Sequence, residues 1–147
     1  MSTAKTDIQY AALPFRLLKS GELQVMLITS RQTRRWLFPK GWPIARLDPP
    51  EVAAREAFEE AGLVGEVGRK AVARYHYRKN IAPDKSRRCV VKVYPLRVRR
   101  VLDEWPEMAE RQREWVSPGE AALRVAEPGL AEFLLTLVGE RHGFFSH

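Results

Sequence analysis

Two spacings of apolar residues divide the chain into predicted strands and helices. Apolar or alternating segments at 11–18, 24–29, 64–67, 71–77, 89–98 and 113–116 predict β-strands. Apolar residues recur at helical spacing over 49–61 and again from Leu130 to Val138, which predicts helices there. Pro83 and Asp84 predict a loop over 80–88. Strands and helices mix without strict alternation, which favours an α/β fold with helices packed on a mixed sheet.

Local signals mark the ends of the first helix. Asp48 can cap it, Pro49 suits the first helical position, and Glu51 follows three residues after the cap. Gly62 is placed to end the helix in a left-handed conformation. The run Ser117-Pro118-Gly119-Glu120 repeats the capping pattern and predicts another short helix.

Composition limits the class of protein. The chain has 147 residues, which suits a single domain over 1–147, and its 45% hydrophobic and 29% charged residues exclude a disordered or fibrous chain. The net charge of +7 predicts an anionic partner. Cys89 is the single cysteine and cannot form an internal disulfide, and no segment is typical of a signal peptide or a membrane span. We therefore expect a cytoplasmic monomer or homodimer that does not bind membranes.

Charge is segregated along the chain. Residues 31–46 carry five basic residues and no acid, and residues 69–100 carry twelve basic residues and one acid. Between them, residues 47–66 hold six acids and one base, Arg55. This order suggests a metal site beside an anion-binding site. The alternative is that the charges only solvate exposed faces.

The predicted helix at 49–61 brings three carboxylates together. Glu56, Glu59 and Glu60 fall within an arc of about 100°. The opposite side is predicted to pack on a sheet and consists of Ala53, Ala54, Ala57, Phe58 and Ala61. A solvated helix face can tolerate such a cluster, but Mg²⁺ or Mn²⁺ bound by the carboxylate oxygens would also relieve the repulsion. The helix pattern alone leaves both interpretations open.

Segment 41–63 resembles the Nudix box, G-x5-E-x7-R-E-U-x-E-E-x-G-U, in which U is a bulky aliphatic residue. Six of the seven fixed letters match at the required spacing, namely Gly41, Arg55, Glu56, Glu59, Glu60 and Gly62, and Leu63 supplies the final aliphatic residue. Leu47 replaces the first box glutamate and Ala57 replaces an aliphatic residue. The first departure removes a carboxylate near the expected metal site.

Similarity extends beyond the box. The runs Arg35-Trp36-Leu37-Phe38-Pro39-Lys40-Gly41 and Val93-Tyr94-Pro95-Leu96-Arg97-Val98 resemble the Nudix branch of diphosphoinositol polyphosphate phosphohydrolases and diadenosine polyphosphate hydrolases. This resemblance implies an α/β/α sandwich around a mixed β-sheet. It also implies an enzyme that hydrolyses phosphorus-containing acid anhydrides with Mg²⁺ or Mn²⁺.

The resemblance assigns roles to residues by position. Glu56, Glu59 and Glu60 would bind the metal, Glu56 would also orient or deprotonate water, and Arg55 would hold a glutamate in place. Gly41 would let the loop turn tightly before the helix. The substrate-binding candidates are basic residues on both sides of the box: Arg31, Arg34, Arg35, Lys40, Arg78, Lys85, Arg87 and Arg88. The candidates for a further carboxylate are Asp103, Glu104, Glu107 and Glu114.

The leading hypothesis is a metal-dependent pyrophosphohydrolase of a highly phosphorylated small molecule, either a dinucleoside polyphosphate or a diphosphoinositol polyphosphate. One alternative is an RNA 5′ pyrophosphohydrolase. Another is a non-catalytic, Nudix-like nucleotide-binding module whose metal site is impaired by Leu47. The chain has no recognisable nucleic-acid-binding motif, so a nucleic acid is not the expected partner.

Overall fold

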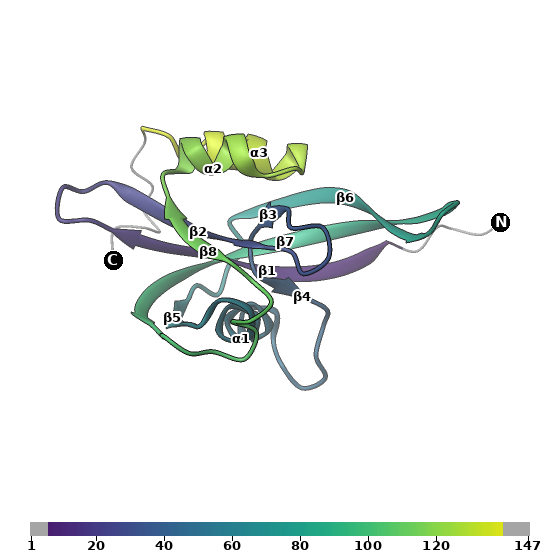
Figure 1. Ribbon diagram of the computed structural model, residues 1–147, viewed down its shortest axis with the longest axis horizontal. Helices are drawn as coiled ribbons and strands as arrows, with labels where there is room; N and C mark the ends of the chain where they lie inside the picture. The colour runs from purple at the N-terminus through teal and green to yellow at the C-terminus, as the bar shows by residue number, and fades with distance from the viewer. Residues whose placement is uncertain (1–5, 140–147) are drawn as a thin grey trace.

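A mixed β-sheet forms the centre of the computed structural model, which describes residues 6–139 (Figure 1). Its main path is β3 (Trp36–Leu37), β2 (Leu23–Thr29), β1 (Asp7–Leu17), β7 (Lys85–Val101) and β5 (Leu63–Val67). Strands β1 and β7 pair in parallel, and the other pairs are antiparallel. Three strands join off this path: β4 (Lys40–Gly41) on β1, β6 (Ala73–Ala82) on β7 and β8 (Arg113–Val116) on β2.

Helices cover both faces of the sheet. Helix α1 (Pro49–Ala61) lies on one face, and α2 (Pro118–Arg124) and α3 (Pro128–Leu135) lie on the other (Figure 1). Under α1, Ala53, Ala57 and Ala61 pack in one buried cluster with apolar residues of the sheet. Leu130 and Leu134 belong to a second buried cluster beneath α2 and α3. This layered arrangement confirms the predicted fold class. No helix within residues 6–139 is long and apolar enough to cross a membrane.

Helix α1 occupies the predicted residues because its end signals are local. The Asp48 backbone N–H donates to Glu51 Oε1 over 3.3 Å. Gly62 follows the helix with φ 66°, in the left-handed region that favours glycine, and its N–H donates to the Phe58 carbonyl. Removing a glycine from this position would strain the backbone and misalign the end of the helix that carries the box glutamates.

The predicted loop over 80–88 is wrong. Strand β6 continues to Ala82, β7 begins at Lys85, and only Pro83 and Asp84 form the turn. The flanking charged residues pair across the hairpin, with Lys79 opposite Arg87. These positions are exposed and lack apolar alternation, so their sequence carries no strand signal. The pairing of β1 with β7 starts at Asp7 opposite Cys89, so the hairpin end at 78–88 extends past β1 (Figure 1).

The carboxylate face of α1 also differs from the prediction. Glu60 is 7% exposed and lies within the buried stripe that also holds Val52, Ala53, Ala57 and Ala61. Phe58, predicted on the packed side, is 41% exposed. The helix is therefore rotated so that the apolar stripe and Glu60 together face the sheet.

Candidate active site

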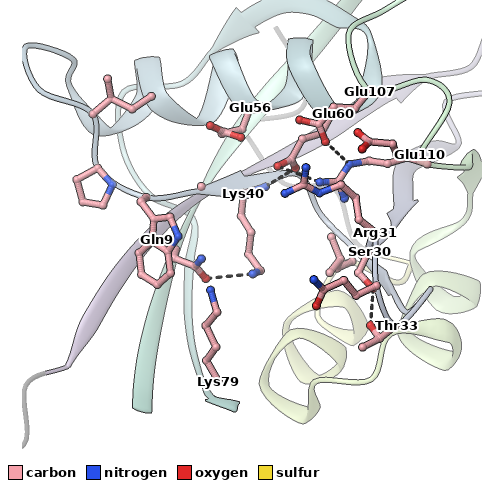
Figure 2. A pocket seen from close by; sticks show the side chains of 17 residues that line it. Gln9, Ser30, Arg31, Thr33, Lys40, Glu56, Glu60, Lys79, Glu107 and Glu110 are labelled. Atoms are coloured by element: carbon pink, nitrogen blue, oxygen red, sulfur yellow. Dashed lines mark hydrogen bonds and ion pairs between the residues drawn. The ribbon is translucent and has the colours of Figure 1, made fainter. Parts of the chain in front are cut away.

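A cleft of about 900 Å³ opens where α1, β4, the β6–β7 hairpin and three loops meet (Figure 2). Acidic side chains from α1 and from the loop before β8 line one part of it. Lys40 and Lys79 line the part toward the hairpin. The loop after β2 contributes Arg31. The cleft thus joins carboxylates and cations in one space.

Glu56 reaches the cleft because Gly41 has no side chain. A Cβ at Gly41 would lie 2.5 Å from Glu56 Cδ, which is closer than real Cβ contacts come. Gly41 lies in β4, opposite Tyr10, rather than in a tight loop turn. The expectation of a turn residue is therefore corrected: this position needs glycine so that a carboxylate can lie directly against the strand.

Glu60 is held by groups on both sides of the cleft. The Lys40 backbone N–H donates to Glu60 Oε1 over 3.1 Å, and Arg111 Nη2 lies 3.4 Å from Glu60 Oε2. Burial, opposed by the charge of Arg111 and reinforced by a hydrogen bond with Glu56, raises the pKa of Glu60 to about 8. Burial also raises the pKa of Glu56. Each of the two carboxylates therefore favours binding a proton or a cation.

The loop between β7 and β8 satisfies the last carbonyls of α1. Three N–H groups of this loop donate to backbone carbonyl oxygens at the end of the helix. The Leu102 backbone N–H donates to the Gly62 carbonyl, the Trp105 indole N–H to the Glu60 carbonyl, and the Glu107 backbone N–H to the Glu59 carbonyl. An α-helix leaves its final carbonyls without partners inside the helix, so this loop acts as its cap. The same loop delivers Glu107, Glu110 and Arg111 to the cleft.

Arg111 connects this loop to strand β2 and contacts the acidic residues Glu60 and Glu107. Its side chain is only 7% exposed. Its Nε lies 2.8 Å from Glu107 Oε1, and its Nη1 donates to the Thr29 carbonyl over 3.0 Å. Arg111 is thus a buried cation shared by Glu60 and Glu107, and it fixes the acidic wall of the cleft.

A hydrogen-bonded group holds Lys40 on the other wall. Its Nζ donates to Gln9 Oε1 over 3.0 Å and to the Tyr77 hydroxyl over 3.1 Å. Tyr77 in turn donates to Gln9 Oε1. Burial lowers the pKa of Lys40, opposed by the charge of Glu60 and assisted by the charge of Lys79. Lys79 Nζ lies 4.5 Å from the centre of the Trp42 ring.

The structure brings together five of the predicted site residues and places the others outside the cleft lining. Arg31, Lys40, Gly41, Glu56 and Glu60 line the cleft. Glu59 instead pairs with Arg55 over 3.5 Å on an exposed part of α1. The remaining six predicted basic residues are exposed: Arg34 and Arg35 after β2, and Arg78, Lys85, Arg87 and Arg88 on the hairpin, where Arg87 pairs with Asp7 over 3.0 Å.

Sequence reasoning missed Gln9, Lys79, Glu110 and Arg111 as cleft residues. Lys79 belongs to the basic tract over 69–100, and no local pattern distinguishes it from its neighbour Arg78. Glu107 was one of four carboxylate candidates and is the one that lines the cleft. Nothing local distinguishes Gln9, because its role depends on Tyr77, sixty-eight residues later.

The chemistry of the donors suits a hard divalent cation. Glu56 and Glu60 supply carboxylate oxygens one helical turn apart, and burial disfavours their ionised forms when no cation is bound. Within residues 6–139 no group of three acidic, histidine or cysteine side chains is arranged to hold a metal ion. Mg²⁺ commonly binds through one or two carboxylates together with water and substrate phosphates, so two carboxylates suffice.

Comparisons with known proteins identify the family. The sequence model of the NUDIX domain matches residues 11–137. The chain is 32% identical over 131 residues to diphosphoinositol polyphosphate phosphohydrolase 3-beta of Bos taurus, covering 86% of this chain and 75% of that protein. It is 35% identical over 117 residues to Nudix hydrolase 21, chloroplastic, of Arabidopsis thaliana, covering 74% of this chain and 54% of that protein.

A solved structure shows the same fold. The crystal structure of a C. elegans Ap4A hydrolase binary complex superposes with a TM-score of 0.65 at 18% identity, covering 88% of this chain and 93% of that one. The predicted resemblance to the diphosphoinositol polyphosphate phosphohydrolase branch is confirmed by the bovine relative. The chain therefore belongs to the Nudix family, and it is a Nudix hydrolase acting on pyrophosphate bonds.

Proposed function

We propose that this chain is a divalent-metal-dependent pyrophosphohydrolase that cleaves a phosphoanhydride bond in a highly phosphorylated small molecule. The observation that carries this proposal is the carboxylate pair of half-buried Glu56 and buried Glu60, which opens into a cleft that also contains Lys40 and Arg31. A dinucleoside polyphosphate or a diphosphoinositol polyphosphate is the proposed substrate class. The names of the bovine phosphohydrolase and the C. elegans hydrolase support this choice.

Glu56 and Glu60 are the proposed ligands of Mg²⁺ or Mn²⁺. When bound, such an ion polarises a phosphoryl oxygen and neutralises charge on the leaving phosphate. The Lys40 backbone N–H and Arg111 hold the Glu60 carboxylate in place. Lys40 and Arg31 attract the phosphate oxygens, and their contribution is positioning and charge stabilisation.

Glu56 is the proposed base. It is less buried than Glu60, and burial raises its pKa above the ordinary value of a glutamate, which makes the carboxylate a better proton acceptor. It would take a proton from water as the water oxygen forms a bond to phosphorus. The bridging P–O bond then breaks, and its electron pair leaves with the departing phosphate.

A substrate panel tests the proposal. The protein is incubated with Mg²⁺ or Mn²⁺ and with nucleoside triphosphates, dinucleoside polyphosphates, inositol pyrophosphates or 5′-triphosphorylated RNA, and the products are identified. We expect turnover of the phosphate-rich small molecules, loss of activity with EDTA, and a loss of at least about 100-fold in Glu60→Gln. Glu66→Gln is the matched control, because Glu66 is an exposed residue on β5 that pairs with Arg99. Efficient turnover by Glu60→Gln would contradict the assignment of Glu60 as a metal ligand. Turnover of RNA alone would contradict the proposed substrate class and favour an RNA 5′ pyrophosphohydrolase.

A further inference from the structure

A second hollow, of about 390 Å³, lies on strands β6 and β7, apart from the catalytic cleft. None of the residues that line it also lines the cleft: they are Ala71, Val72, Ala73, Arg74, Lys92 and Tyr94. Both the charged side chains and the tyrosine hydroxyl of this hollow lie outside the machinery described above.

Strand alternation places these polar side chains on the face of the sheet that α1 covers. Tyr94 belongs to the buried cluster under α1, whereas Val91 and Val93 belong to the cluster under α2 and α3. Successive side chains of a strand point to opposite faces, so Lys92 shares the α1 face with Tyr94. Arg74 lies directly opposite Lys92 in the register of β6 on β7 and so shares that face.

Arg74 and Lys92 form a cross-strand pair of like charges. Like charges directly opposite each other on neighbouring strands are destabilising. In the part of the chain that the structure describes, neither side chain has an acidic partner within 4 Å. Lys92 is also half-buried, which reduces the solvation of its ammonium. An anion bound between the two side chains would offset both the repulsion and the lost solvation.

Tyr94 adds a hydroxyl donor to the same hollow. The residue is 6% exposed, and its ring packs against that of Tyr10 with the ring centroids 6.3 Å apart. Within residues 6–139 the Tyr94 hydroxyl makes no hydrogen bond. Burial raises the pKa of Tyr94, and the charge of Arg74 opposes this rise, so the hydroxyl stays protonated at neutral pH. A buried tyrosine hydroxyl usually finds a partner, and a ligand in the hollow would supply the acceptor.

We propose that Arg74, Lys92 and Tyr94 form a binding site for a phosphate group on the α1 face of the sheet, separate from the catalytic cleft. The planar guanidinium suits two phosphate oxygens, and the ammonium and the hydroxyl donate to the same group. This inference goes beyond the proposed function, because none of the three residues takes part in the hydrolysis. Free inorganic phosphate and the phosphate group of a larger molecule present the same oxygens to this site.

NMR titration of ¹⁵N-labelled protein tests the site, because backbone amides report on the hollow and on the cleft separately. Inorganic phosphate and glycerol 3-phosphate are each added in EDTA, so no metal takes part. We expect saturable shifts of the Ala73 and Tyr94 amides, which report on the hollow, while the Gly41 and Glu56 amides report on the cleft. The lower of the two Kd values at the hollow shows whether free phosphate or an attached phosphate group is the better ligand.

Substitutions in the hollow should weaken this binding. We expect Arg74→Gln and Lys92→Gln each to raise the Kd at the hollow about tenfold, which is the scale of one charge-assisted contact. Tyr94→Phe, which keeps the ring and removes the hydroxyl, should raise this Kd about threefold. The matched controls are Arg100→Gln and Lys19→Gln, because both residues are exposed outside the hollow and make the same changes in charge.

Thermal unfolding shows that lost binding is not lost folding. Without phosphate, Lys92→Gln should unfold at or above the wild-type Tm, because it removes one of two opposed like charges. Phosphate should raise the Tm of the wild type by binding to the folded state, and it should raise the Tm of Lys92→Gln less.

Three results would overturn the inference. These are no saturable shift of the Ala73 and Tyr94 amides, shifts confined to the amides of the cleft, or equal Kd values for Lys92→Gln and Lys19→Gln. Glu60→Gln should bind phosphate in the hollow as the wild type does while losing turnover, because Glu60 does not line the hollow. Failure of the whole substrate panel would overturn the proposed function and leave phosphate binding in the hollow in place.

Discussion

Lys40 and Glu60 are joined by a hydrogen bond of 3.1 Å from the Lys40 backbone N–H to Glu60 Oε1. Lys40 also sends its side chain to Gln9 and Tyr77. Because β4 is only two residues long and is fixed by pairing with β1, one short strand sets the spacing between the carboxylate pair and the cations.

The affinity for divalent metal should rise with pH. The pKa of Glu60 is about 8 in the folded protein, above its ordinary value of 4.5, so the folded state binds the extra proton between these values. In metal-free protein the free energy of unfolding should therefore fall as pH rises from about 4.5 to about 8, by at most about 1.4 kcal/mol per pH unit. A divalent ion competes with that proton, so Mn²⁺ titrations should show tighter binding over the same range. Glu60→Gln should flatten the pH dependence of metal-free stability, and an unchanged slope in this variant would contradict the assignment to Glu60.

Gly41→Ala should reduce kcat without unfolding the protein. The added Cβ would lie 2.5 Å from Glu56 Cδ, and the flexible glutamate side chain, rather than the strand, is the group able to move. A displacement of about 1 Å at a catalytic group can cost on the order of 100-fold in rate. Gly119→Ala is the control, because its Cβ would meet only Val138 at 3.8 Å. Normal kcat in Gly41→Ala would show that Glu56 does not need this approach.

Replacing Arg111 should destabilise the protein more than replacing an exposed arginine. Arg111→Met leaves Glu60 and Glu107 without their shared buried cation, and removing one partner of a buried pair costs about 3–5 kcal/mol. Thermal unfolding should show a Tm lower by roughly 10 °C. Arg99→Met, which breaks the exposed pair with Glu66, should change the Tm by no more than about 2 °C. Equal effects of the two substitutions would show that Arg111 does not stabilise the acidic wall.

The features that could be predicted are those set by neighbouring residues. Helix α1 has its predicted bounds because Asp48, Pro49 and Gly62 act within one turn of its ends. The burial of Glu60 could not be predicted in this way, because it depends on Arg111 in a distant loop. Gln9 and Tyr77 meet only through the register of β1 and β6 on β7, which no local pattern specifies. The positions of the carboxylates could therefore be predicted from the box. The residues of the opposite wall of the cleft could be identified only from the tertiary structure.

Leu47→Glu should strengthen metal binding or increase the rate without unfolding the chain. Leu47 is half-buried in the segment between β4 and α1, directly before the capping residue Asp48. A carboxylate here would lie near the positive end of the helix dipole, which favours negative charge. Leu47→Gln controls for the change in polarity. If both variants unfold, or if both bind Mn²⁺ like the wild type, the missing box glutamate does not limit this site.

Substrates with more phosphates should react with higher kcat/KM than ordinary nucleoside triphosphates. The hairpin also carries the positive charges of Arg78, Lys85, Arg87 and Arg88, although these four lie outside the cleft lining. Their attraction acts at a distance, so the preference for diadenosine pentaphosphate over ATP should weaken as salt rises and screens charge over about 8–10 Å. Arg88→Glu should raise KM more for the long substrate than for the short one. Lys19→Glu, in the exposed turn between β1 and β2 far from the hairpin, makes the same charge change and should not discriminate (Figure 1). Equal kcat/KM for both substrates at all salt concentrations would remove the polyphosphate part of the proposal and leave the family assignment intact, because the box and the fold do not depend on the hairpin charges.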